Sequence, residues 1–175
     1  GDRVLRKEDE RFLRGSGTYS DDITKPGQCY AAFVRSPVPH GTLRRIDTDA
    51  AIKSDGVMAV LTGGDYIADG YGPVVHRAIE GDPIDFRTPA FGGDDPVALQ
   101  FNQWPLPSEK VNHLGEPLAI VIAETIMAAE DAAERVVLDI DPLPAVITVD
   151  QATVAGAPLV NDDASANTTK RTRHS

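Results

Sequence analysis

The stretch LGEPLAIVIAE, residues 114–124, contains the carboxylate best placed for chemistry. Glu116 precedes an apolar run of six residues, and its nearest polar neighbour toward the N-terminus is His113. A desolvated carboxylate with a partner within hydrogen-bond reach can act as a general base. However, Pro117 restricts Glu116 to extended backbone conformations, and Gly115 permits a sharp turn. We therefore interpret the Gly-Glu-Pro triplet as the entry to a buried strand, with catalysis as the alternative.

Other residue types that carry chemistry are sparse. Cys29 is the only cysteine, which excludes an internal disulfide and a Cys-rich zinc or iron-sulfur site built from this chain alone, and it favours a reducing compartment. Ser16 does not follow an apolar strand, so RGSGTY predicts a tight turn and not a nucleophile. Four histidines lack the spacing of a metal site: His40, His76, His113 and His174. We predict no catalytic, cofactor-binding or metal-ligating residue in this chain.

Composition excludes two further classes of function. The 175 residues carry a net charge of −10, and eight of the 17 basic residues lie in the first fourteen and last six positions. The acidic middle repels phosphate backbones, which argues against nucleic-acid binding. No apolar run approaches the roughly 18 residues of a membrane span. A chain of this length, 41% apolar, is expected to form one sizeable core.

The positioning elements form two strand-helix-strand units. In the first, Cys29 to Arg35 and Val57 to Thr62 are predicted strands around a short helix within 47–55, capped by Thr48 or Asp49. In the second, Leu118 to Ala123 is an unbroken apolar run, typical of a strand covered on both faces.

A helix capped by Thr125 follows that strand, and its apolar stripe comprises Ile126, Ala129, Ala133 and Val136 or Val137. The segment VVLDIDPLP then alternates as a strand with one wet face. We expect an α+β fold.

Between the units, residues 66–110 are rich in Gly, Pro and Asp and show little periodicity. This segment contains the only tryptophan, Trp104, and three of the five phenylalanines, so we expect it to pack against its own core or against a partner. Residues 161–175 are polar and lack apolar periodicity. The predicted organisation is a domain over 1–160 and a flexible tail over 161–175.

Four stretches, in order, resemble one family. They are RVLRKEDERFLRGSGTYSDDI, AAFVRSPVPHGTLRRIDTDAAIKSDGVMAVLTGGD, PLPSEKVNHLGEPLAIVIAET and VVLDIDPLPAVITVDQA, the last followed by GAPLVNDD. Together they are similar to the opening of the large, molybdopterin-binding chain of the xanthine dehydrogenase, aldehyde oxidase and aerobic carbon monoxide dehydrogenase family. The resemblance covers nearly the whole chain apart from residues 66–104, and it implies an α/β hammerhead domain.

The resemblance also implies what the whole protein does. Such enzymes oxidise an aldehyde, an N-heterocycle or carbon monoxide at a molybdenum-molybdopterin centre, with oxygen taken from water, and pass electrons through 2Fe-2S clusters to FAD. Those cofactors belong to later domains or partner subunits, so this fragment is expected to be inactive by itself. Its expected partners are the molybdopterin domains of the same polypeptide and the iron-sulfur and FAD subunits of an oligomeric, cytoplasmic assembly.

Six residues emerge as candidate interdomain or turn contacts: Arg35, His40, Trp104, His113, Gly115 and Glu116. The sequence departs from the family pattern beside two of them, with Pro39 and Gly41 around His40, and with His113 and Leu114 before the Gly-Glu-Pro triplet. Two alternatives remain open from the residues alone. One is a stand-alone binding or scaffold module with the same fold, and the other is a small enzyme that uses Glu116 and His113.

Overall fold

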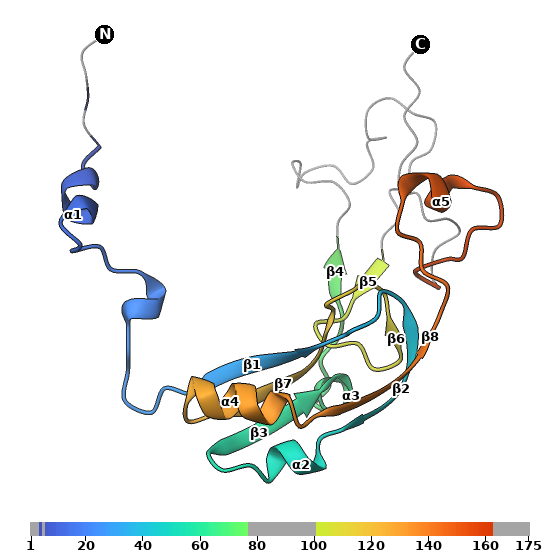
Figure 1. The fold of residues 1–175 in the computed structure, drawn as a ribbon, viewed down its shortest axis with the longest axis horizontal. Coiled ribbons are helices and arrows are strands. Elements are labelled where there is room, and N and C mark those ends of the chain that lie inside the picture. The colour runs from blue at the N-terminus through green and yellow to red at the C-terminus, as the bar shows by residue number, and fades with distance from the viewer. Residues whose placement is uncertain (1–3, 5, 77–100, 163–175) are drawn as a thin grey trace.

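The computed structural model describes residues 4, 6–76 and 101–162 (Figure 1). Within these residues the strands form two three-stranded antiparallel sheets and one separate antiparallel pair. The first sheet has the order β1 (Tyr30–Arg35), β7 (Pro117–Ala123), β3 (Val57–Thr62). The second has the order β6 (Lys110–Val111), β2 (Gly41–Asp47), β8 (Val137–Pro142). The separate pair joins β4 (Val74–His76) to β5 (Phe101–Gln103).

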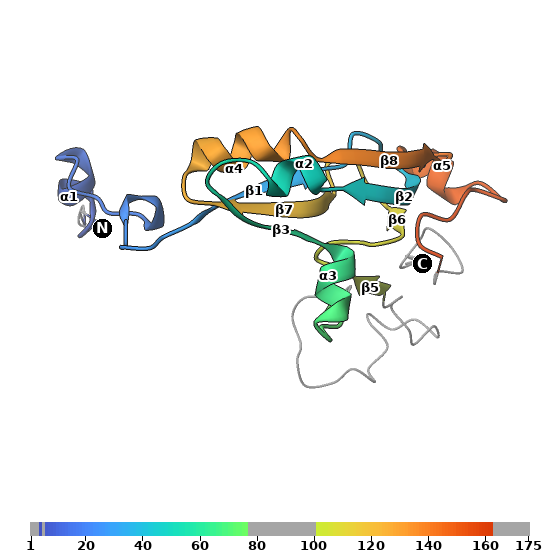
Figure 2. The same ribbon diagram turned by 90° about the horizontal axis from the view of Figure 1, so that it is seen from below.

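The helices are short. They are α1 (Asp9–Leu13), the 3-10 helix η1 (Ser20–Asp22), α2 (Asp49–Ile52), α3 (Gly63–Ala68), α4 (Ile126–Ala133) and α5 (Val149–Thr153). None of them is long and apolar enough to cross a bilayer. Helices α1 and η1 lie apart from the sheets in both views and contain no buried residue (Figures 1 and 2).

Two strand-helix-strand units link the sheets. The units β2-α2-β3 and β7-α4-β8 each have one strand in each sheet, so α2 and α4 each connect a strand of one sheet to a strand of the other. The predicted α+β class is confirmed, and so is the cap at Thr125, whose Oγ1 accepts the N–H of Ala128 at 3.1 Å. Thr48 precedes α2 as predicted, but its side chain makes no capping hydrogen bond. Strand β2 was missed because GTLRRID alternates poorly, and its pairing with both β6 and β8 outweighs that weak local signal.

The main core lies between the first sheet and α4. Ala129 and Ala132 are fully buried, and Ala132 belongs to one apolar cluster with Ala119 and Val121 of β7. Their small side chains allow the helix to approach the sheet closely. The predicted stripe is wrong at Ile126, whose side chain is 43% exposed at the start of α4, and Ala132 occupies the buried position that the prediction omitted.

Among the described residues, helices cover only one face of the first sheet. Helices α2 and α4 lie on one side of it, and the opposite side is bare over most of its length (Figure 2). Ile120 and Ile122 of β7 are accordingly only partly buried. The expectation that this strand is covered on both faces is therefore wrong within the described residues, although its apolar run predicts such a cover.

Two predicted segments fall largely outside the described residues. The irregular segment 66–110 is described only at its ends, which contribute the last turn of α3, β4, β5 and β6. The predicted tail, 161–175, is described only to residue 162, so the boundary at residue 160 stays a prediction.

Candidate functional site

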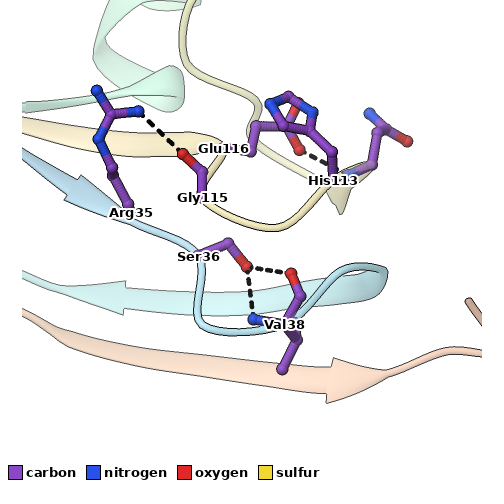
Figure 3. Close-up of polar contacts among 7 residues, drawn as sticks. Arg35, Ser36, Val38, His113, Gly115 and Glu116 are labelled. Carbon is purple, nitrogen blue, oxygen red and sulfur yellow. Dashed lines mark hydrogen bonds and ion pairs between the residues drawn. The ribbon is translucent and has the colours of Figure 1, made fainter. Parts of the chain in front are cut away.

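The Gly-Glu-Pro triplet forms a tight turn between β6 and β7 (Figure 3). Gly115 has φ +78°, a left-handed conformation that side chains disfavour, and the N–H of Glu116 donates to the carbonyl of His113 at 3.2 Å. Ser36, just after β1, joins this turn through both of its backbone groups. Its N–H donates to the Glu116 carbonyl at 2.9 Å, and its carbonyl accepts the N–H of Gly115 at 3.0 Å. The turn is therefore fixed to the end of a neighbouring strand.

The Glu116 carboxylate points into the protein and satisfies the backbone of its own turn. The residue is 7% exposed, and Oε2 accepts the backbone N–H of Asn112 at 2.6 Å. Oε1 lies 3.7 Å from Nδ1 of His113, too far for a hydrogen bond, and the His113 side chain is 60% exposed. Glu116 and His113 therefore lie close together but do not form the hydrogen bond that a general base and its orienting partner require. The geometry favours a structural role for this carboxylate.

Arg35 and Ser36 close the other side of the turn (Figure 3). Nη1 of Arg35 donates to the Gly115 carbonyl at 2.9 Å, and its guanidinium lies 5.4 Å from the ring centroid of Phe33. Ser36 is 3% exposed, and its hydroxyl donates to the carbonyl of Val38 at 2.8 Å and accepts the N–H of Val38 at 3.1 Å. The sequence analysis missed Ser36 and Asn112. The serine-proline pair in FVRSPVP, typical of a hydroxyl-bonded turn, could have identified the first.

A cavity of about 280 Å³ lies beside the turn, and its lining includes Gln103, Trp104, His113 and Glu116. Trp104 follows β5, so the tertiary structure brings the predicted contact residue next to the predicted turn. The volume is just below the roughly 300–1,000 Å³ of small-molecule sites.

His40 occupies a different place and is not part of the cavity lining. It is 4% exposed just before β2, and its Nδ1 lies 2.8 Å from the carbonyl of Pro144. A carbonyl only accepts, so Nδ1 carries the proton in this contact. Nε2 is buried and has no hydrogen-bond partner among the described residues. His40 thus fastens the start of β2 to the segment that follows β8.

Replacing Glu116 separates its structural role from catalysis. We expect Glu116→Ala to lower the free energy of unfolding by about 1–3 kcal/mol, because the N–H of half-buried Asn112 would lose its acceptor. Glu116→Gln keeps an acceptor oxygen and should lose less. Chemical denaturation of both variants, with the exposed Glu109→Gln as a control, tests this expectation. Equal stability of Glu116→Ala and the control would contradict it.

Comparison with known proteins places this geometry in a family. Residues 14–144 match the family described as "Aldehyde oxidase and xanthine dehydrogenase, a/b hammerhead domain". The chain is 35% identical to the carbon monoxide dehydrogenase large chain of Hydrogenophaga pseudoflava, over 95% of this chain and 18% of that protein. It is 33% identical to the nicotine 6-hydroxylase large subunit of Paenarthrobacter nicotinovorans, over 100% of this chain and 19% of that subunit.

Solved structures show the same fold. A Cu,Mo-CO dehydrogenase matches with a TM-score of 0.73 and 32% identity, over 97% of this chain and 19% of that one. The quinoline 2-oxidoreductase of Pseudomonas putida 86 matches with a TM-score of 0.79 and 30% identity, over the same shares. The chain therefore spans about a fifth of the length of the relatives it matches.

Proposed function

Because this chain belongs to the aldehyde oxidase and xanthine dehydrogenase family through its a/b hammerhead domain, we propose that it is the structural N-terminal domain of a molybdenum-dependent hydroxylase or dehydrogenase large subunit. One observation carries the proposal. Similarity covers 95–100% of this chain but only 18–19% of two curated large subunits. A domain that is one part of such a subunit matches it in this way, whereas a separate enzyme of this size has no counterpart for the other four fifths.

The complete polypeptide would oxidise an aldehyde, an N-heterocycle or carbon monoxide, with the added oxygen derived from water. The described residues do not fit a molybdenum site, since they contain no group of three His, Cys, Asp or Glu side chains that could hold a metal ion. Within this proposal the molybdenum-molybdopterin cofactor would be held by parts of the polypeptide outside this chain, and 2Fe-2S and FAD by partner domains or subunits in a cytoplasmic, oligomeric assembly. The chain itself contributes positioning, while the cofactors contribute the chemistry.

Under this proposal, the buried candidate residues stabilise the domain itself, and the more exposed ones contact other domains. Gly115 and Glu116 hold the turn, and buried His40 holds the segment around Pro144. Arg35 and His113 have exposed side chains, and half-buried Trp104 stands beside the same cavity as His113. We assign interdomain contacts to these last three.

The mass and metal content of the native polypeptide test the proposal. The protein that yields the peptide LGEPLAIVIAE should be several times longer than 175 residues and should contain a stoichiometric amount of molybdenum. Glu116→Gln in that polypeptide should retain substrate oxidation, because Glu116 is not the catalytic base. A native polypeptide of this length without molybdenum would overturn the proposal, and turnover by it would revive Glu116 and His113 as catalytic candidates.

A further inference from the structure

The bare side of the first sheet carries a continuous apolar surface. The strand register sets Phe33 and Leu61 on either side of Ile120, and it sets Ala31 and Ala59 on either side of Ile122. Directly paired residues point to the same side of a sheet, so these six side chains share one face. We call this surface the open face: Ala31, Phe33, Ala59, Leu61, Ile120 and Ile122.

The open face is the opposite of the helix-covered face. Val34, Ala119 and Val121 alternate with the open-face residues along β1 and β7, and all three are buried in one apolar cluster with Ala132 of α4. By contrast, Phe33 is 48% exposed and Leu61 is 41% exposed. Contiguous apolar patches are uncommon on soluble monomers and mark interaction sites. The apolar run of β7 is typical of a strand buried on both faces, but within residues 6–76 and 101–162 only one of its faces is covered by helices.

Arg35 places a positively charged guanidinium at the edge of the open face. Its guanidinium lies 5.4 Å from the ring centroid of Phe33 and donates one hydrogen bond, to the Gly115 carbonyl. Among the described residues it has no acidic partner. If two copies of the chain paired through their open faces, the open face of the second copy would offer no carboxylate to Arg35, because its six residues are all apolar. An occupant with an apolar surface and an acceptor at its edge fits better than a second copy.

We propose that the open face is buried against a segment of the same full-length polypeptide, outside these 175 residues, that is apolar and bears a carboxylate or carbonyl acceptor for Arg35. This inference rests on the proposed function. In the relatives, about four fifths of the large subunit lies outside the matched part, so the polypeptide supplies ample length for such a segment. A tethered segment also acts at a high effective concentration, which favours it over a separate chain.

The only two methionines of the chain provide an internal test. Met58 is 59% exposed beside the open face, next to the core residue Val57, and its sulfur lies 3.2 Å from that of Cys29 just before β1. Met127 is 64% exposed on α4, on the other side of the sheet, near the exposed Glu130 and Asp131. Their similar exposure predicts similar rates of oxidation wherever neither is covered.

Mild peroxide oxidation of the native full-length polypeptide, held monomeric and free of other subunits, should therefore modify Met58 roughly tenfold more slowly than Met127. The same polypeptide unfolded in urea should show equal rates. Equal rates in the native monomer would overturn the inference. Protection of Met58 that arises only on dimerisation, or only when another subunit is added, would also overturn it, because the occupant would then be a different chain.

A pair of variants gives a second readout. Leu61→Asp should lower the melting temperature of the full-length polypeptide by several degrees, since it places a charge against the docked segment. Met127→Asp, on the solvated face of α4, should leave that temperature unchanged. Equal effects of the two variants would contradict the inference.

These results are separable from a failure of the proposed function. Molybdenum in a long polypeptide whose Met58 reacts as fast as Met127 would refute the docking and leave the function standing. A long polypeptide without molybdenum whose Met58 is protected would refute the function and leave the docking standing.

Discussion

Leu118→Ala is expected to lower the free energy of unfolding by about 2–5 kcal/mol. Leu118 is fully buried, two residues after Glu116, and it belongs to the cluster that includes Leu43 and Val111 beneath the second sheet. Truncation removes apolar contacts and leaves a cavity that the surrounding strands fill only partly. The same side chain anchors the start of β7, so the loss should also loosen the Gly-Glu-Pro turn.

The matched control for this variant is Leu114→Ala. Leu114 has the same side chain, lies four residues earlier and is 65% exposed, so its truncation should change stability by no more than about 0.5 kcal/mol. Urea unfolding of both variants measures the difference through the midpoint at constant slope. If the two variants unfold at the same midpoint, the second cluster does not stabilise this part of the fold.

Gly63→Ala is expected to destabilise the chain by about 1–3 kcal/mol or more. A β-carbon at this position would lie 2.8 Å from the carbonyl carbon of Pro107 and closer still to the carbonyl oxygen of Leu106. Both obstacles are backbone atoms, so a rotamer change cannot relieve the clash. The glycine thus permits the corner between β3 and α3 to pack against the segment after Trp104. Displacing that segment should also alter the cavity at the turn.

Gly64→Ala is the control for Gly63→Ala. A β-carbon at Gly64 would meet only the hydroxyl of Thr62, at an ordinary contact distance of 3.5 Å. Gly64 lies within helix α3, where alanine is favoured over glycine by up to about 1 kcal/mol, so this variant should be neutral or more stable. Thermal unfolding of the two variants tests the contrast. Similar melting temperatures would mean that the corner has room for a side chain at Gly63.

Local signals in the sequence predicted much of this fold correctly. The strand over residues 57–62 is observed as β3 with the predicted ends. The wet and dry alternation of β8 is observed as well, with Leu138 and Ile140 more buried than Asp139 and Asp141. Both depend on nearest-neighbour patterning and turn residues, which a short window of sequence contains. The order of four family-like stretches likewise led to the family that the comparisons show.

The predictions failed where distant residues decide. Strand β2 is stabilised by partners about 70 and 95 positions later in the chain, and no local pattern in GTLRRID encodes them. The buried stripe of α4 shifted from Ile126 to Ala132 because the orientation of the helix on the sheet sets which side chains are covered. The role of Glu116 also depended on distant residues, since Ser36 and Arg35 approach its turn from β1.

The sequence by itself determined the α+β class, the main helix and its cap, and the family, because each follows from local patterns or from residues in a fixed order. Only the tertiary structure decided that Glu116 faces inward to the Asn112 N–H, and that Trp104 and His113 share a cavity beside it. It also decided that, in the part of the chain that the structure describes, helices cover β7 on a single face, although its apolar run predicts cover on both. Whether a residue is buried depends on segments that are far apart in the chain. An apolar run predicts that a strand is buried, but it does not identify the segments that pack against it.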